Sequence, residues 1–143
     1  MSATGAAMNL ALLDELRLAT LDPAVWTLNL RALAADQPEL AAELERTTLP
    51  AAWQPARALD DFVTWRLEEP GQPPIWLGES AAPRTRARAL LAQFDPHGKN
   101  PALPCLGCGA ELRVLLDRLP AYTAAFVFET DLRVLAAVLR TQD

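Results

Sequence analysis

Two glycines and two acidic residues near the end of the sequence have the spacing of a nucleotide-binding turn. A short apolar run ends in Gly107-Cys108-Gly109, a helical pattern follows, and a second apolar run ends in Glu129-Thr130-Asp131. Glycine adopts backbone angles closed to other residues and lets a ligand approach the main chain. A helix that begins near Ala110 would direct its free N–H groups at that ligand. Glu129 follows Gly109 by 20 residues, which is about where an acid binds the ribose in dinucleotide sites.

Each part of this pattern also has a purely structural interpretation. Leu112 stands where a full dinucleotide fingerprint has a third small residue, so the turn could join a strand to a helix without binding a ligand. Thr130 or Asp131 could instead cap the next helix by accepting from its free N–H groups. The candidate ligand-binding residues are therefore Gly107, Cys108, Gly109, Glu129 and Asp131, and the sequence offers no candidate catalytic residue.

The cysteines and the histidine provide weak support for a metal or redox site. Cys105 and Cys108 form one C-x-x-C motif, and His97 is the one histidine of the chain. A structural zinc site needs four ligands, and these residues supply three. A redox cysteine usually opens a helix, whereas Cys108 is enclosed by Gly107 and Gly109 inside the turn. We expect two buried thiols and no metal.

Composition limits the classes of function. The chain has 143 residues, of which 51% are hydrophobic, and its formal net charge is −5. That charge argues against a general nucleic-acid-binding protein, which needs a basic face. The sequence has no apolar run long enough to span a membrane and does not open with a signal-peptide pattern. We expect a cytoplasmic protein with reduced cysteines.

Residues 1–50 read as a helical region, and residues 51–99 as a small β element followed by a helix. Helices are expected over 9–19, from the Asp22-Pro23 cap to Ala35, and over 39–46. Alternating residues around 56–58 and 62–67 predict two strands joined by a turn at Asp60-Asp61. A third strand is expected over 75–77, and a helix from 80–83 to 94.

Residues 100–143 read as a partial Rossmann-like βαβα unit, which makes the predicted fold class α/β. Adjacent parallel strands are expected over 103–106 and 124–128, joined through a helix over 110–119, and a last helix over 131–140. Two parallel strands cannot cover both of their faces, so the chain reads as the front part of something longer. The surface next to strand 124–128 and the apolar stripe Leu132, Leu135, Leu139 are then expected to be poorly covered, and the stripe is expected to mediate homo-oligomerisation.

From about Asn29 onward the sequence resembles the N-terminal portion of bacterial glycosyltransferase-like proteins related to the motility accessory factor group and to MptE-like pterin diphosphokinases. The resemblance rests on residues 29–33 and 38–41, on the strands around Trp65 and Trp76, on helix 83–94, and on residues 106–109 and 126–132. It implies an N-terminal module that contributes to a nucleotide-sugar site at Gly107–Gly109. It also implies that a downstream domain carries the catalytic residues.

Two other functions fit the same residues. Leu106-Gly107-Cys108-Gly109 also resembles motif I of S-adenosylmethionine-dependent methyltransferases, with an acid closing the next strand. Alternatively the chain is a non-catalytic interaction module, in which the helices and strands pack on a partner and the glycine turn binds nothing.

Overall fold

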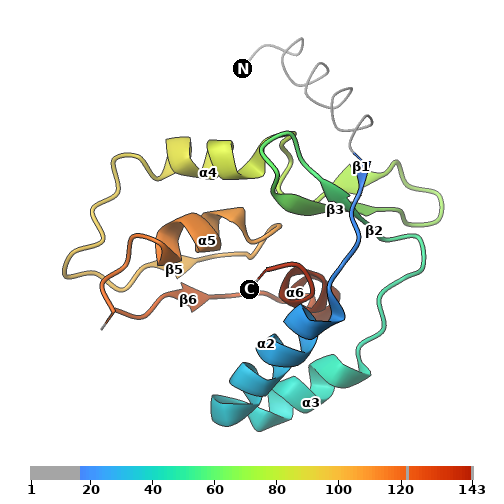
Figure 1. The fold of residues 1–143 in the computed structure, drawn as a ribbon, viewed down its shortest axis with the longest axis horizontal. Helices are drawn as coiled ribbons and strands as arrows, with labels where there is room; N and C mark the ends of the chain where they lie inside the picture. Colours follow the sequence, from blue (N-terminus) through green and yellow to red (C-terminus); the bar gives the residue numbers. More distant parts are fainter. Residues whose placement is uncertain (1–16, 122, 143) are drawn as a thin grey trace.

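The computed structural model describes residues 17–121 and 123–142 and has a mixed α/β architecture (Figure 1). Four strands form an antiparallel sheet in the order β1-β2-β3-β4, and two further strands form a separate parallel sheet, β5-β6. In chain order the elements are β1 (Arg17–Leu18), α2 (Pro23–Asp36), α3 (Pro38–Arg46), β2 (Gln54–Arg57), β3 (Val63–Leu67), β4 (Ile75–Trp76), α4 (Pro83–Leu90), β5 (Ala102–Leu103), α5 (Ala110–Leu116), β6 (Phe126–Val127) and α6 (Leu132–Leu139).

The first two described helices begin where the sequence predicts. The Asp22 carboxylate accepts a hydrogen bond from the Ala24 N–H (2.9 Å), and Pro23 occupies the first helical position of α2. Pro38 opens α3 in the same position, and Leu44 of α3 is fully buried. Both predicted helices are confirmed, because their start signals are local to the sequence.

The helix predicted over 9–19 is wrong for its last residues. Arg17 and Leu18 form β1, which pairs antiparallel with β2 through Arg17↔Arg57 and Leu18↔Ala56. The open edge of β2 offers unpaired backbone groups, and pairing with that edge overrides the local helical pattern. Residues 9–16 lie outside the described part of the chain.

The predicted antiparallel element is confirmed. β2 pairs with β3, and β3 pairs with β4, as the alternation and the turn signals indicated. Asp61 adopts a positive φ of 67° in the turn between β2 and β3. The neighbouring Asp60 carboxylate accepts from the Phe62 N–H (3.3 Å) and from the Thr85 N–H of α4 (2.8 Å), so it joins the hairpin to α4.

Helix α4 ends earlier than predicted. The apolar pattern extended to Phe94, whereas the helix stops at Leu90. The guanidinium group of Arg118 donates to the carbonyls of Leu91 and Phe94. A side chain 27 residues beyond Leu91 and 24 beyond Phe94 therefore holds the segment that follows α4 in its non-helical path.

Strands β5 and β6 pair in parallel, with Ala102 beside Phe126 and Leu103 beside Val127. Helix α5 lies between the two strands in the chain. The predicted parallel pair is confirmed, although each strand has two residues and α5 ends at Leu116. A Rossmann-like fold is not confirmed, because the parallel sheet has two strands and is separate from the four-stranded sheet.

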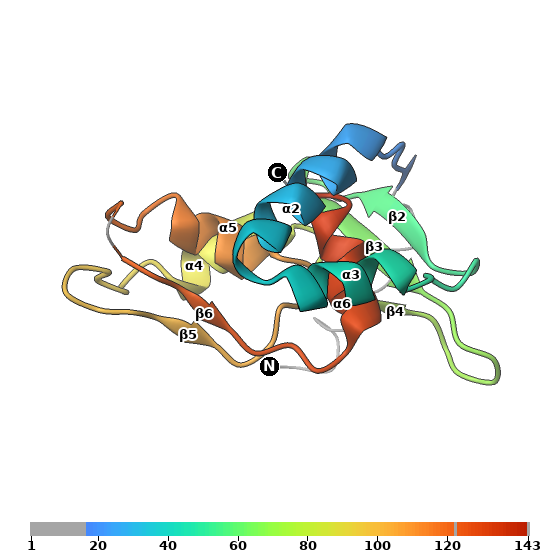
Figure 2. The same ribbon diagram turned by 90° about the horizontal axis from the view of Figure 1, so that it is seen from below.

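The core joins the antiparallel element to the C-terminal helices. One cluster contains residues of the β2–β3 hairpin, α4 and α5: Ala58, Phe62, Ala87, Cys108, Ala110 and Val114. A second cluster packs Trp53, Trp65 and Leu67 against Ala137 of α6. The Trp65 Nε1–H donates to the Ala137 carbonyl (3.0 Å), and the Asn29 amide donates to the carbonyls of Leu139 (2.9 Å) and Gln142 (2.6 Å). Helix α6 is therefore held by α2, α3 and β3 (Figures 1 and 2).

The C-terminal stripe is more enclosed than predicted. Leu132, Leu135 and Leu139 are half-buried, and α6 packs against α2 and α3. The apolar surface left open by the described residues therefore lies elsewhere in the fold. Within residues 17–121 and 123–142, no helix combines the length and the apolar composition needed to cross a membrane.

Candidate functional site

The glycine turn has the backbone conformation that its residues predict. Gly107 and Gly109 have φ angles of 56° and 86°, in the left-handed region that favours glycine. The Gly109 N–H donates to the Leu106 carbonyl (3.0 Å), and Gly109 caps the N-terminus of α5. The need for glycine is therefore explained by the turn itself.

The two glycines differ in the space beside them. A Cβ atom on Gly109 would lie 2.8 Å from Val138 Cγ1 and 3.4 Å from Gln142 Cγ. The end of α6 therefore fills that side of Gly109, where a ligand was expected. A Cβ atom on Gly107 would meet only Glu111 Oε2, at 4.0 Å, so the backbone of Gly107 remains approachable.

Cys108 is a core residue. Its side chain is 1% exposed and lies against Gly78, where an added Cβ atom would be 2.5 Å from Cys108 Sγ. Burial raises the pKa of the Cys108 thiol to about 11, so the thiol is protonated and unreactive at neutral pH. Cys105 is exposed and both thiols are free, so the prediction of two buried thiols is wrong for Cys105.

Glu129 connects the glycine turn to the end of β6. One carboxylate oxygen accepts from the Leu106 N–H (3.1 Å), and the other accepts from the Asp131 N–H (2.9 Å). These bonds bring Glu129 and the glycine turn together, as the spacing predicted. Each Glu129 oxygen thus accepts one backbone hydrogen bond, which gives the carboxylate a structural role at the turn.

Asp131 caps α6, which is one of the two roles that the sequence left open. Its carboxylate accepts from the Arg133 N–H (2.9 Å) and from the Arg133 guanidinium group (2.9 and 3.1 Å). These Arg133 interactions lower the pKa of Asp131 below its usual value. Arg133 also contacts Glu69 (3.2 Å), so Asp131 belongs to a network that joins α6 to the loop after β3.

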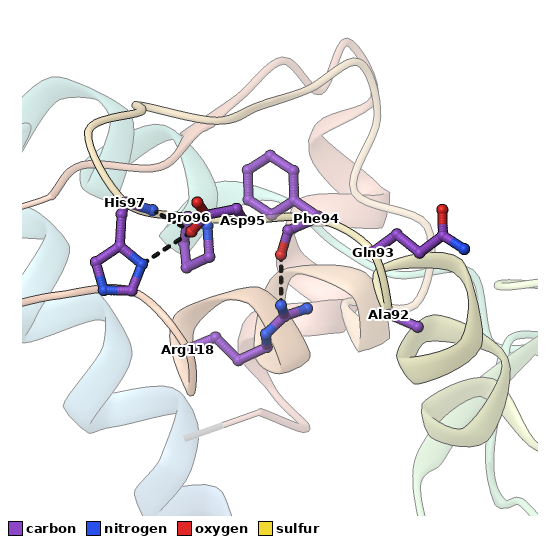
Figure 3. A pocket seen from close by; sticks show the side chains of 7 residues that line it. All are labelled: Ala92, Gln93, Phe94, Asp95, Pro96, His97 and Arg118. Carbon is purple, nitrogen blue, oxygen red and sulfur yellow. Dashed lines mark hydrogen bonds and ion pairs between the residues drawn. The ribbon is translucent and has the colours of Figure 1, made fainter.

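A hollow of about 480 Å³ lies beside the segment that follows α4 (Figure 3). Asp95 accepts from the His97 N–H (3.0 Å) and contacts the ring Nδ1 of His97 (2.8 Å). Arg118 lines the hollow, but its guanidinium group is bound to the Leu91 and Phe94 carbonyls. The sequence predicts a helix as far as Phe94 and a polar loop from Asp95, and His97 is the one residue of the hollow that the sequence offers as a candidate metal ligand. Its lining residues are Ala92, Gln93, Phe94, Asp95, Pro96, His97 and Arg118.

No cluster of three or more potential metal-ligating side chains occurs in the described ranges, 17–121 and 123–142.

An apolar face of the β5–β6 sheet is left uncovered by the described residues, as the sequence predicted for a pair of parallel strands. Side-chain exposure alternates along both strands, and the register places the exposed positions side by side on one face. Figure 2 shows α4 and α5 on one side of these strands. The exposed positions, here called the sheet face, are Ala102, Pro104, Ala124, Phe126 and Phe128.

The two phenylalanines dominate the sheet face. Phe126 and Phe128 are 51% and 64% exposed. Among the described residues only one face of this parallel pair is covered. The signal available in the sequence was the number of helices, which is too small to cover both faces of a parallel pair.

Comparison of the chain with protein-family models, with curated proteins and with solved structures found no match.

Proposed function

We propose that this chain is a non-catalytic interaction module, acting as the N-terminal portion of a glycosyltransferase-like protein. The sheet face receives the catalytic domain of that protein. The observation that carries the proposal is the exposure of Phe126 and Phe128 on a parallel sheet. Parallel strands are normally covered on both faces, and an exposed apolar patch commonly marks a surface of association.

The state of the candidate site supports a structural role for the glycine turn. Val138 and Gln142 fill the space beside Gly109, and each Glu129 oxygen accepts a hydrogen bond from a backbone N–H. Asp131 is engaged by Arg133. The turn therefore joins β5 to α5 and packs against the end of α6, and the sheet face provides the contact. We further propose a cytoplasmic location, which the free and exposed thiol of Cys105 supports.

The proposal predicts weak self-association of the isolated chain. At several hundred micromolar, exposed sheet faces should pair, and Phe128→Asp should weaken that pairing at least about tenfold because a charge would be buried against an apolar surface. Sedimentation velocity across a wide concentration range measures the effect. Leu28→Asp is the matched control, because Leu28 is 63% exposed on α2 and the added charge is the same. A monomer at all concentrations, unchanged by Phe128→Asp, would contradict the proposal.

A second candidate function is nucleotide binding at the turn, favoured by the open side of Gly107 and the nearby Glu129 carboxylate. Calorimetry with UDP, CMP and S-adenosylmethionine separates the alternatives. The interaction module predicts no heat of binding from any of them. Binding of UDP or CMP would indicate a nucleotide-sugar site, and binding of S-adenosylmethionine alone would indicate a methyltransferase.

Gly107→Ala is the variant for that experiment. Its Cβ atom would collide with nothing, with Glu111 Oε2 at 4.0 Å, and would obstruct a ligand at the turn; the φ of 56° adds a strain of about 1–2 kcal/mol, so circular dichroism must show that the variant is folded. Gly109 is unsuitable, since a side chain there would collide with Val138 and disturb the fold itself.

A further inference from the structure

We propose that the occupant of the sheet face is an amphipathic α-helix of the partner, with basic residues flanking its apolar stripe. This inference rests on the proposed function and adds the chemistry of the partner.

The shape of the sheet face favours a helix. The register sets Ala102 beside Phe126, and the Phe128 N–H bonds to the Leu103 carbonyl (3.0 Å), which brings Phe128 beside Pro104. A column of small residues therefore runs along a column of aromatic rings, about 4.8 Å away. A helix about 10 Å in diameter can lie over the small column and pack against the rings.

The length of the sheet face sets the length of the helix. Residues 124–128 span roughly 16 Å at about 3.3 Å per strand residue. An α-helix of roughly 11 residues, or three turns, covers that distance. Helices are also the elements that normally cover the faces of parallel sheets.

The small area argues against a second copy of this chain as the stable occupant. Two half-exposed phenylalanine rings and their small neighbours offer on the order of 300 Å². A stable interface needs about 800 Å² on each partner. Pairing of two copies through the sheet face should therefore stay weak, whereas a helix of a larger partner adds contacts around the rim.

Charge sets the polar flank of the helix. The chain carries a net charge of −5. At the carboxyl end of β6, Glu129, Asp131 and Glu69 provide three carboxylates, and Arg133 is the cation that contacts two of them. A helix with lysine or arginine beside its apolar stripe complements this surface. Its positive N-terminal end is best placed at the carboxyl ends of the strands, so the helix runs antiparallel to β6.

The test uses three 14-residue probe peptides and the full chain. The first places leucine at helical spacing with lysine elsewhere. The second has the same composition in strict alternation, and the third replaces lysine by glutamate in the helical pattern. NMR titration of the chain measures each dissociation constant and identifies the perturbed residues. We expect the helical leucine–lysine peptide to bind at least about tenfold more tightly than either of the others.

Variants locate the binding site. Phe126→Ser/Phe128→Ser should weaken binding of the first peptide at least about tenfold, whereas Leu28→Ser should leave it unchanged. Both phenylalanines are exposed, and circular dichroism checks that the double variant keeps the fold. If the alternating peptide binds as tightly as the helical one, the proposal that the occupant is a helix is wrong. If the first peptide still binds the double variant, the proposal that it binds at the sheet face is wrong.

Comparing peptide binding with self-association shows whether the helical occupant or the sheet-face interface itself is wrong. If no peptide binds but Phe128→Asp still suppresses self-association, the sheet face is an interface and its occupant is not a basic amphipathic helix. If the peptide binds, it should also displace the self-associated form. If neither peptide binding nor self-association depends on the sheet face, both proposals are wrong.

Discussion

Gly78→Ala is expected to destabilise the protein by about 2–5 kcal/mol, through two separable effects. Gly78 has a φ of +85°, and a residue with a Cβ atom pays about 1–2 kcal/mol in that region. The new Cβ atom would also lie 2.5 Å from Cys108 Sγ, and overpacking of this kind costs about 1–3 kcal/mol. Urea unfolding followed by tryptophan fluorescence measures the change in the free energy of unfolding.

Two further variants separate strain from collision. Gly71→Ala tests strain alone, because Gly71 has a φ of +76° and no atom lies within 4 Å of its added Cβ; a loss of about 1–2 kcal/mol is expected. Cys108→Ala removes the sulfur. In that background Gly78→Ala should cost no more than Gly71→Ala does in the wild-type protein. Equal effects of Gly78→Ala and Gly71→Ala in the wild-type background would mean that the Cys108 side chain moves aside freely.

Phe62→Ala is expected to cost about 3–5 kcal/mol, which is enough to unfold many small domains. Phe62 is 1% exposed and belongs to the core cluster with Ala58, Ala87 and Cys108. Its removal would leave a cavity between the hairpin, α4 and α5. Thermal and urea unfolding both measure the loss of stability.

Phe128→Ala is the matched control, since it deletes the same atoms from a ring that is 64% exposed. It should change the free energy of unfolding by less than about 1 kcal/mol, because little apolar surface is lost from the fold. A large effect of Phe128→Ala would mean that the sheet face is covered in the isolated chain. That result would also remove the basis for docking on it.

The sequence predicts those parts of the fold whose signals are local. Asp22-Pro23 specifies a cap and a first helical residue, and α2 begins there. Asp60-Asp61 lies between two alternating runs and forms the turn between β2 and β3. The glycine turn was predictable for the same reason, since Gly107 and Gly109 both need positive φ angles.

Features set by distant residues could not be predicted. Arg17 and Leu18 form a strand because β2 has an open edge about 40 residues later in the chain. Beyond the end of α4 at Leu90, the chain follows a path that is held by Arg118, which donates to the Leu91 and Phe94 carbonyls. Neither pairing leaves a mark in the local pattern.

The candidate site also has features that the sequence predicts and features that depend on distant residues. Spacing correctly brought Glu129 to the glycine turn, and Asp131 to the start of α6. Spacing could not reveal that Val138 fills the space beside Gly109, because that contact depends on how α6 packs. The uncovered surface at strand 124–128 was predictable from the small number of strands and helices, and the exposed rings of Phe126 and Phe128 confirm it.

The position of α6 affects how the chain folds as it is synthesised. Asn29 bonds to Leu139 across 110 residues, and Trp65 bonds to Ala137 across 72. At about 5–20 residues per second, a ribosome needs roughly 5–20 s between making Asn29 and making its partner. During that interval α2, α3 and the hairpin lack the helix against which they pack. The nascent chain therefore exposes Trp65 until α6 emerges, and transiently exposed apolar surface of this kind promotes aggregation during synthesis.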